Sequence, residues 1–470
     1  MDTHFFHERI NNMKTDTIAA IATAMSPSGI GIIRLSGEEA LSIVDKIYRS
    51  KSGNKKLSEC ESHTIHYGYI YDEDTLIDEV MVLLMKAPRS YTTEDTVEID
   101  CHGGVFVMKR ILETVIKYGA RPAEPGEFTK RAFLNGRIDL TQAESVIDVI
   151  NSKNDFALRS STQQLRGNLK QDVKDVREKI IHEIAFIESA LDDPEHISLD
   201  GYPDSLSSIV KEQITHIDKL LANSDNGRML KEGIMTVIVG KPNAGKSSLL
   251  NLMMGEERAI VTDIAGTTRD VLEEQIQLGG ISLNIVDTAG IRDTEDIVEK
   301  IGVDKAKEYL SKADLIIYVV DSSVPLEEND YEIMELLQDR KAIVLLNKTD
   351  LESVVTEEEV KNHLDKNMIA FSAKDSTGMT ELEETIKDMF FQGEVSFNDE
   401  VIITNIRQKN SLQEAKNSLN LVLRSIEDAM PEDFYSIDLM NAYESLGNII
   451  GESVEDDLVN EIFSKFCMGK

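Results

Sequence analysis

The chain has 470 residues, enough for about three domains, and its 85 acidic and 50 basic side chains give a formal net charge of −35. That charge opposes sequence-independent binding of nucleic acid backbones, which requires positive charge, and three cysteines are too few for a disulfide framework. No apolar run is long enough for a membrane span and no signal-peptide core is visible, so we expect a cytoplasmic protein in a reducing compartment.

Residues 16–120 are predicted to form a domain of mixed α and β structure. Short apolar runs predict strands, and two longer periodic runs predict helices. The expected strands are 31–35, 64–70, 79–85 and 96–100, and the expected helices are 38–48 and 105–118, the second closed by Gly119. The leader before Lys14 is expected to be a dispensable extension, with Met13 as an alternative start.

A proline-free stretch at 126–193 is predicted to be helical. Within it, leucine, valine and isoleucine recur at steps of four and three residues over 165–191, which predicts one long amphipathic helix. The acidic helical segment 394–470 is too small to bury a core alone. We therefore expect it to pack against the helices before residue 229, so that the domain at about 230–392 is an insertion.

The inserted domain begins with a glycine-rich loop. An apolar run at 234–239 leads into Gly-Lys-Pro-Asn-Ala-Gly-Lys-Ser at 240–247, and a helical run follows. Backbone N–H groups of such a loop surround a polyphosphate, while Lys246 reaches the β- and γ-phosphates and Ser247 offers its hydroxyl to Mg²⁺. The residues expected to contact the nucleotide here are Asn243, Ala244, Gly245, Lys246, Ser247 and Ser248.

Four further motifs follow in the order of a guanine nucleotide-binding domain. The carboxylate of Asp350 can accept from both the ring N–H and the amine of guanine, which adenine cannot supply, so Asp350 should select GTP. Thr268 should complete the Mg²⁺ coordination and take part in catalysis. The expected contacts are Thr262, Asp263, Ile264, Ala265, Gly266, Thr267 and Thr268; Asp287, Thr288, Ala289 and Gly290; Asn347, Lys348, Thr349 and Asp350; and Ser372, Ala373 and Lys374.

Several stretches of the chain match one family. They are the loop at 240–247, Gly-Thr-Thr-Arg-Asp at 266–270, the stretches 123–136 and 139–144, and the end Phe-Cys-Met-Gly-Lys at 466–470. Nearly the whole chain after residue 14 resembles the bacterial tRNA modification GTPases of the MnmE (TrmE) family. The resemblance implies a multidomain α/β fold: an N-terminal α+β domain for folate binding and dimerisation at 1–129, a helical domain at 130–228 and 394–470, and an inserted Ras-like P-loop G domain at 229–393.

The resemblance also implies a function. Members of this family are homodimers that form a heterotetramer with an FAD-containing MnmG (GidA) subunit, which carries most of the tRNA affinity. Together they build an aminomethyl or carboxymethylaminomethyl group on C5 of the wobble uridine, position 34, of certain tRNAs. The implied cofactors are GTP, Mg²⁺, K⁺ and a 5-formyl- or 5,10-methylene-tetrahydrofolate.

The residue that orients the attacking water is not evident from the motifs. Ras-like enzymes place a glutamine after Asp-x-x-Gly, where this chain has Ile291. The resemblance points to Glu299, although its acidic surroundings also fit a solvated helix carboxylate. Asparagine at the position of Asn243 is a common loop-stabilising residue, yet the resemblance makes it a K⁺ ligand. The implied K⁺ ligands are Asn243, Thr262, Ile264 and Thr267.

The resemblance assigns the folate to residues from both ends of the chain, namely Arg34, Glu98, Arg137 and Lys470. Arg34 and Glu98 lie on predicted strands, where an ordinary surface ion pair is the alternative. A carboxylate suits the aminopyrimidine edge of a pterin because that edge presents paired donors, as a guanidinium does. Cys467 joins the catalytic residues, in a polar tail that is expected to gain little from packing.

Two other functions share the G-domain motifs. A GTPase of ribosome assembly would usually add a basic RNA-binding module or a second G domain, and this sequence shows neither. A pure regulatory switch would take no part in the chemistry, so its folate residues and Cys467 would be dispensable. The sequence leaves open whether GTP hydrolysis drives a conformational cycle or the modification chemistry.

Overall fold

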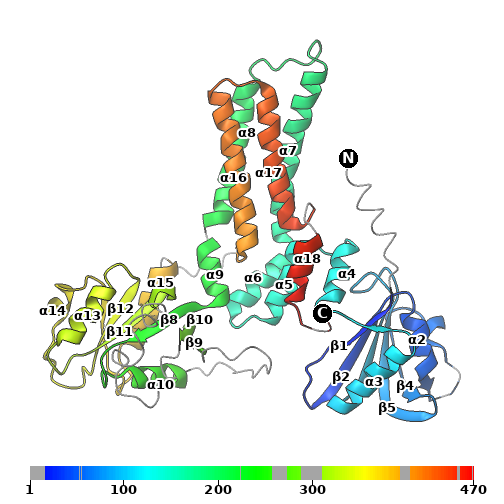
Figure 1. Cartoon of the computed structure of the whole chain (residues 1–470), viewed down its shortest axis with the longest axis horizontal. Helices are drawn as coiled ribbons and strands as arrows, with labels where there is room; N and C mark the ends of the chain where they lie inside the picture. Colours follow the sequence, from blue (N-terminus) through cyan, green and yellow to red (C-terminus); the bar gives the residue numbers. More distant parts are fainter. Residues whose placement is uncertain are drawn as a thin grey trace. The chain divides into compact units, whose positions relative to one another are not determined.

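The chain divides into two compact units, one inserted in the other (Figure 1). The computed structural model describes residues 16–51, 53, 55–222, 224–256, 273–286, 310–391, 403–452, 456–467 and 469. The first unit comprises Met1–Asn151, Ser161–Ile214 and Ser411–Lys470, and the second comprises Ser152–Ser160 and Thr215–Asn410. The predicted insertion is therefore confirmed.

The N-terminal part of the first unit is a seven-stranded sheet with the order β3-β4-β5-β6-β2-β1-β7. Its pairs are antiparallel except for β1 with β7. Helices α2 (Ala40–Ile47) and α3 (Val105–Lys117) pack their apolar faces against it to form a buried core (Figure 1). The strands are β1 (Ile18–Ile21), β2 (Ser28–Ser36), β3 (Tyr48–Ser50), β4 (Thr64–Asp72), β5 (Thr75–Met85), β6 (Thr96–Gly103) and β7 (Arg121–Pro122), and a short 3₁₀ helix, η1, spans Leu57–Glu59.

A small helical cluster joins this sheet to the C-terminus. Helices α4 (Glu127–Leu134) and α5 (Leu140–Ile150) contact each other, and α18 (Asp456–Ser464) contacts α4. Asp139 begins α5 with a capping box, because its side chain accepts from the backbone N–H of Gln142 while the Gln142 side chain accepts from the N–H of Asp139. The apolar contacts between α5 and α18 bring the C-terminal tail close to the N-terminal sheet.

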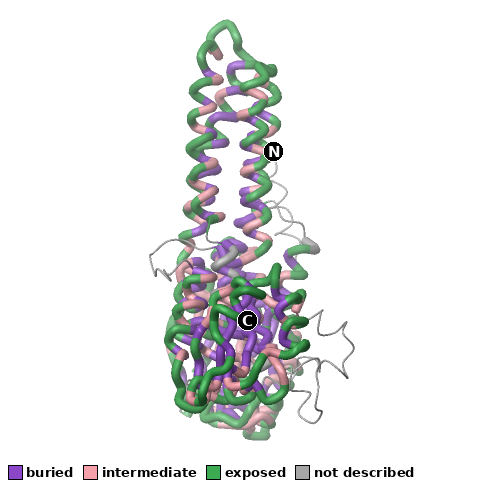
Figure 2. Tube along the Cα trace, turned by 90° about the vertical axis from the view of Figure 1, so that its left-hand side faces the viewer, coloured by how far each residue is buried: buried purple, intermediate pink, exposed green. Residues whose placement is uncertain are grey.

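The C-terminal segment packs against an earlier helix, as predicted. Helices α7 (Asn168–Asp192) and α17 (Glu432–Ile450) lie side by side (Figure 1), and both alternate buried and exposed residues along their length (Figure 2). The prediction of one helix over 165–191 is wrong at its start. Leu165 ends α6 (Asp155–Leu165), and Gly167, with φ of 89°, separates it from α7. Two further long helices are α8 (Tyr202–Ala222) and α16 (Ile406–Glu427).

The second unit contains a six-stranded sheet with the order β13-β12-β11-β8-β10-β9, parallel except for the antiparallel edge pair β9–β10. Apolar cores lie on both of its faces, as in doubly wound α/β domains. Its strands are β8 (Ile234–Val239), β9 (Glu273–Leu278), β10 (Ile281–Val286), β11 (Leu315–Asp321), β12 (Ala342–Asn347) and β13 (Asn367–Ala370), and its helices include α9 (Ser224–Glu232), α10 (Lys246–Glu256), α13 (Glu328–Leu336), α14 (Glu357–Lys361) and α15 (Met379–Phe391). This arrangement confirms the predicted Ras-like fold.

Within the described ranges, no helix is both long enough and apolar enough to cross a membrane.

Candidate functional site

The glycine-rich loop lies between β8 and α10 and approaches the neighbouring strand ends closely. Gly245 has φ of 105°, and a Cβ atom there would lie 2.0 Å from Nδ2 of Asn347. Only glycine fits this position without displacing the asparagine. The loop therefore runs directly over the end of β12, with Lys246 as the first residue of α10.

Lys246 is held by its own loop. Its ammonium group donates to the carbonyl oxygens of Gly240 at 2.6 Å and Lys241 at 2.8 Å. Burial lowers the pKa of Lys246, because no carboxylate neutralises it among the described residues. A bound polyphosphate would supply the missing negative charge at this position.

Asn347 connects the two loops that would hold the phosphates and the base. Its amide nitrogen donates to the carbonyl of Ala244 at 2.7 Å, and its amide oxygen accepts from the backbone N–H of Ala373 at 3.2 Å. The asparagine is fully buried at the end of β12. Asn347 therefore uses both its amide nitrogen and its amide oxygen to hold the loop 240–245 in place relative to the loop that follows β13.

Asp350 presents an ionised carboxylate in the same place. Ser372 donates to its Oδ1 at 3.2 Å and Lys374 to its Oδ2 at 3.3 Å. Burial alone would raise the pKa of Asp350, but these two hydrogen bonds and the charge of Lys374 outweigh it, so the pKa lies below its ordinary value. A carboxylate that stays ionised can accept from two donors, as the guanine edge requires.

One residue of this region was missed by the motifs. Asp321 ends β11 directly opposite Asn347 and accepts from the ammonium group of Lys348 at 2.5 Å. This contact fixes Lys348, whose backbone has a positive φ of 67°. The sequence does carry the signal, since Asp321 follows a fully apolar run and the carboxyl ends of parallel strands meet at one edge of a sheet.

Several predicted nucleotide-site residues lie outside the described residues, and so does Lys470. They are Thr262, Asp263, Ile264, Ala265, Gly266, Thr267, Thr268, Asp287, Thr288, Ala289, Gly290 and Glu299. The structure therefore brings together the loop 240–247, Asn347 to Asp350, and Ser372 to Lys374.

A second site lies in the first unit around Arg34 and Glu98. These residues face each other on β2 and β6, and the Arg34 Nε donates to Glu98 Oε1 at 2.6 Å. Both side chains are largely buried, with 18% and 15% of their surfaces exposed. The Arg34 guanidinium also lies 5.7 Å from the ring centre of Phe128 and 6.0 Å from that of Tyr91.

The C-terminal tail reaches this site. Arg34 Nη1 donates to the carbonyl of Gly469 at 3.1 Å, and the Gly126 N–H donates to the carbonyl of Cys467 at 3.4 Å. Phe466 is only 5% exposed and packs against Phe463 with the rings tilted by 42° and a ring-centre distance of 5.2 Å. The expectation that the tail gains little from packing is therefore wrong, because burying a phenylalanine contributes about 2 kcal/mol. The Cys467 side chain is exposed.

Arg137 joins the same site through the aromatic ring of Tyr91. Its guanidinium carbon lies 4.8 Å from the ring centre of Tyr91, the ring that Arg34 also approaches. The Tyr91 hydroxyl forms a hydrogen bond of 2.9 Å with that of Thr129 on α4. No motif pointed to Tyr91, because its role depends on side chains brought from β2 and α4.

A buried ion network fixes α4 beside this site. Arg131 pairs with Glu94 at 3.0 Å and with Glu127 at 3.1 Å, and Glu127 also pairs with Arg121 at 2.5 Å. Burial acts to raise the pKa of Glu127, but the Arg121 hydrogen bond, the Glu124 backbone N–H and the charge of Arg131 outweigh it and lower the pKa. Glu127 is therefore ionised at neutral pH.

Comparisons with known proteins identify the family to which the chain is similar. Residues 140–467 match the family model of the MnmE helical domain, and residues 17–137 match that of the GTP-binding protein TrmE N-terminus. The tRNA modification GTPase MnmE of Lachnoclostridium phytofermentans is 63% identical over 458 residues, which cover 97% of this chain and 100% of that protein. The protein of the same name from Clostridioides difficile is 49% identical over 460 residues, which cover 97% and 99%. The solved G domain of the T. maritima FeoB iron transporter is 30% identical, covers 33% of this chain and 97% of its own, and has a TM-score of 0.26.

Proposed function

The chain belongs to the MnmE family of tRNA modification GTPases, and we propose that it acts on C5 of the wobble uridine, position 34, of certain tRNAs. It is a GTP-hydrolysing enzyme of tRNA modification. The proposed product is an aminomethyl or carboxymethylaminomethyl uridine, made in a heterotetramer with an FAD-containing MnmG-like subunit. The net charge of −35 supports a division in which that subunit provides most of the tRNA affinity.

Each domain has its own part in the proposed function. Residues 1–129 bind folate and form a homodimer, residues 130–228 and 394–470 form the helical domain, and residues 229–393 form the G domain. We place the complex in the cytoplasm, where the three free cysteines remain reduced.

In the G domain, Lys246 would hold the β- and γ-phosphates, Ser247 and Thr268 would ligate Mg²⁺, and Asp350 would select guanine. The described residues fit the phosphates and the guanine base. Lys246 is a buried cation without a carboxylate partner among the described residues, and Asp350 is an ionised acceptor beside Ser372. When bound, Mg²⁺ neutralises charge on the phosphate oxygens.

Asn243, Thr262, Ile264 and Thr267 would ligate K⁺. Glu299 would orient the attacking water. Asn243 fits a ligand role because it is exposed at the loop with a positive φ of 63°. Its side chain has no hydrogen-bond partner in the part of the chain that the structure describes, so its amide oxygen is available. A bound monovalent cation supplies positive charge next to the phosphates.

In the first unit, Arg34, Glu98, Arg137 and Lys470 would hold the folate. Arg34 occupies only Oε1 of Glu98, so Oε2 remains to accept from the aminopyrimidine edge of a pterin. The guanidinium of Arg34 keeps that carboxylate in place. A bound formyl- or methylene-tetrahydrofolate supplies the one-carbon unit, and the exposed Cys467 thiol lies on the tail that Arg34 contacts.

The observation that carries this function is the contact of Arg34 with both Glu98 and Gly469, which joins the two ends of the chain at one site. The test is mass spectrometry of wobble uridines from a deletion strain complemented with the wild type, Glu98→Gln, Cys467→Ser or Cys60→Ser. The wild type and Cys60→Ser should restore the modified uridine, and Glu98→Gln should not. If Glu98→Gln and Cys467→Ser both restore it fully, the chain is a regulatory switch without a folate-dependent step.

Cys467→Ser separates a chemical role of the thiol from a structural one, because serine keeps the size and removes most of the nucleophilicity. Cys60→Ser is the matched control, since Cys60 is a free cysteine remote from the tail in sequence.

A further inference from the structure

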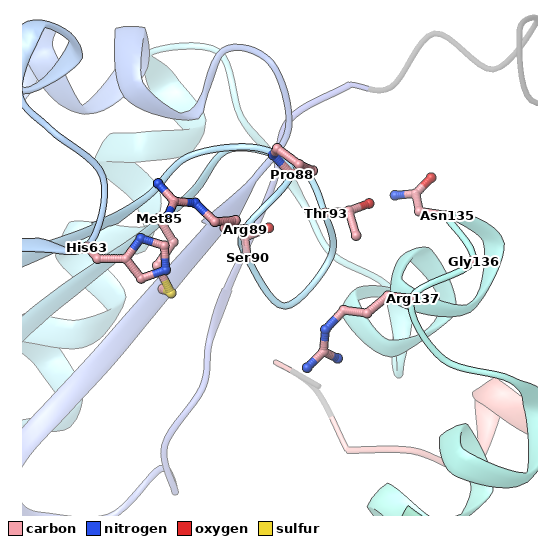
Figure 3. Close-up of a pocket in the computed structure, with 9 residues that line it drawn as sticks. All are labelled: His63, Met85, Pro88, Arg89, Ser90, Thr93, Asn135, Gly136 and Arg137. Atoms are coloured by element: carbon pink, nitrogen blue, oxygen red, sulfur yellow. The ribbon is translucent and has the colours of Figure 1, made fainter. Parts of the chain in front are cut away.

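A pocket of about 560 Å³ lies beside the proposed folate site, and Arg137 is the only one of its lining residues with a role in the assignments above. It is lined by residues from three connections of the first unit. His63 precedes β4, Arg89 and Thr93 belong to the loop between β5 and β6, and Asn135 and Arg137 belong to the turn after α4 (Figure 3).

The lining is cationic. Two arginines and a histidine line this pocket, and no carboxylate does. Neither Arg89 nor Arg137 forms an ion pair with any described residue, whereas the buried Arg34 and Arg131 nearby are both paired. Unneutralised guanidinium groups are unexpected in a chain with a net charge of −35. They are suited to carboxylate or phosphate ligands, which they bind with paired N–H donors.

The cations are spread along the pocket rather than gathered at one point. In Figure 3, Arg89 extends toward His63, while Arg137 extends from the turn after α4 on the other side of the loop that holds Thr93. Asn135 also lines the pocket, and its amide nitrogen donates to the carbonyl of Thr92 at 2.7 Å. This arrangement favours a ligand with several negative charges along a chain.

Arg137 links the pocket to the proposed folate site. Arg137 lies 4.8 Å from the ring centre of Tyr91, and Arg34, which holds Glu98, lies 6.0 Å from the same ring. Tyr91 also belongs to the loop that supplies Arg89 and Thr93. A folate whose pterin contacts Glu98 would therefore pass Tyr91 and extend its glutamate end toward Arg137 and the pocket.

We propose that this pocket binds the carboxylates of an oligo-γ-glutamate tail, so that the protein prefers polyglutamylated folates to the monoglutamate. This inference rests on the proposed folate function. Arg137 holds the first carboxylates and Arg89, with His63, holds the later ones. Each additional carboxylate forms charge-assisted hydrogen bonds, which contribute more than neutral ones do.

The test is calorimetric binding of 5-formyl-tetrahydrofolate to the full chain, with the monoglutamate and the triglutamate compared at equal ionic strength. The triglutamate should bind the wild type at least about tenfold more tightly, as one charged hydrogen bond can provide. Arg89→Gln should remove that preference and leave monoglutamate affinity unchanged. Arg89→Lys, which keeps the charge, should retain part of it.

Arg110→Gln is the matched control, because Arg110 is an exposed arginine of the same domain that pairs with Asp72 outside the pocket. It should keep the full preference for the triglutamate. An equal loss in Arg89→Gln and Arg110→Gln would show a general charge effect and overturn the proposal.

The remaining outcomes distinguish this inference from the folate function. Equal affinity of the wild type for the two folates overturns the pocket assignment and leaves the folate site standing. Binding of neither folate overturns both. If Arg89→Gln keeps the triglutamate preference but weakens binding of tRNA, the pocket is a phosphate site and the tail assignment is wrong.

Discussion

The guanidinium of Arg34 donates a hydrogen bond of 3.1 Å to the carbonyl of Gly469, a residue 435 positions later in the chain. The same guanidinium holds Glu98 at 2.6 Å. The tail is therefore in direct contact with the side chain that positions the proposed pterin ligand. Its location explains how a change at the C-terminus can affect a site on the N-terminal sheet without involving the G domain.

Displacing the tail should separate tRNA modification from GTP hydrolysis. Gly469 has φ of 86°, and a Cβ atom there would lie 2.5 Å from the carbonyl oxygen of Ile21. Gly469→Ala should therefore weaken folate binding at least about tenfold, as expected for loss of a charged hydrogen bond. It should also reduce modification, measured by mass spectrometry of tRNA, and leave kcat for GTP unchanged.

The control for this change is Gly201→Ala, because Gly201 also has a positive φ, 73°, but has open space around its Cβ position. It should leave folate binding intact. Deletion of residues 467–470, which spares the buried Phe466, should reproduce the effect of Gly469→Ala. Full tRNA modification by Gly469→Ala and by the deletion variant would show that the tail is dispensable.

Guanine specificity should depend on Asp350. In Asp350→Asn the amide can donate to the xanthine carbonyl where the carboxylate accepted from guanine. GTP affinity should fall about 10- to 100-fold, the cost of a charged hydrogen bond, while xanthosine triphosphate affinity should rise. Competition binding measures both. Unchanged GTP affinity with no gain for the xanthine nucleotide would refute the role of Asp350. The control is Asp375→Asn, in the loop after β13 that also carries Ser372.

Local motifs explain why the nucleotide site could be predicted. Asn347 ends a fully buried strand, Asp350 follows it, and Ser372 follows the next strand. The parallel order of these strands places the three residues at one edge of the sheet. The same principle would have identified Asp321. The helix break at Gly167 was missed because Leu165 and Leu169 keep the step of four, so periodicity continues across the turn.

The site on the N-terminal sheet could not be predicted from sequence periodicity, because it depends on contacts between residues far apart in the chain. Alternation along a strand shows that Arg34 and Glu98 face the same side, but not that Tyr91 and Gly469 meet them there. The burial of Phe466 was missed for the same reason, since its partner Phe463 and the cover from α4 and α5 exist only once the chain has folded.

GTP turnover should be faster in K⁺ than in Na⁺ at matched ionic strength. Asn243 offers its amide oxygen beside the phosphate loop, and the glutamine of Ras-like enzymes is replaced by Ile291. Asn243→Ala should remove the preference and lower the K⁺-dependent rate at least about tenfold, the scale of losing a group that stabilises transition-state charge. Equal wild-type rates in the two salts would contradict the K⁺ site.

Glu299→Ala should slow turnover and leave nucleotide affinity nearly intact. A residue that orients the attacking water acts mainly in the transition state, so kcat should fall about 100-fold without a matching change in GTP dissociation constant. Single-turnover hydrolysis and equilibrium binding measure the two quantities. Glu328→Ala, on α13, is the control. A solvated carboxylate at Glu299 would leave both quantities unchanged.

The network around Glu127 should make the stability of the first unit depend on pH. The pKa of Glu127 is lowered from an ordinary value of 4.5, because the Arg121 hydrogen bond and the charge of Arg131 outweigh the effect of its burial. The stabilisation is therefore present above pH 4.5 and is lost as the pH falls through the lower pKa of the folded state.

Glu127→Gln tests this dependence. At pH 7 it should destabilise the first unit by about 2 kcal/mol, less than for a fully buried pair because Arg121 is partly exposed. Thermal unfolding followed from pH 7 to pH 3 should show the difference from the wild type narrowing below pH 4.5. Glu124→Gln removes an exposed carboxylate three residues away and should show no such difference. A difference between wild type and Glu127→Gln that stays constant over this range would mean that the ionised carboxylate does not stabilise α4.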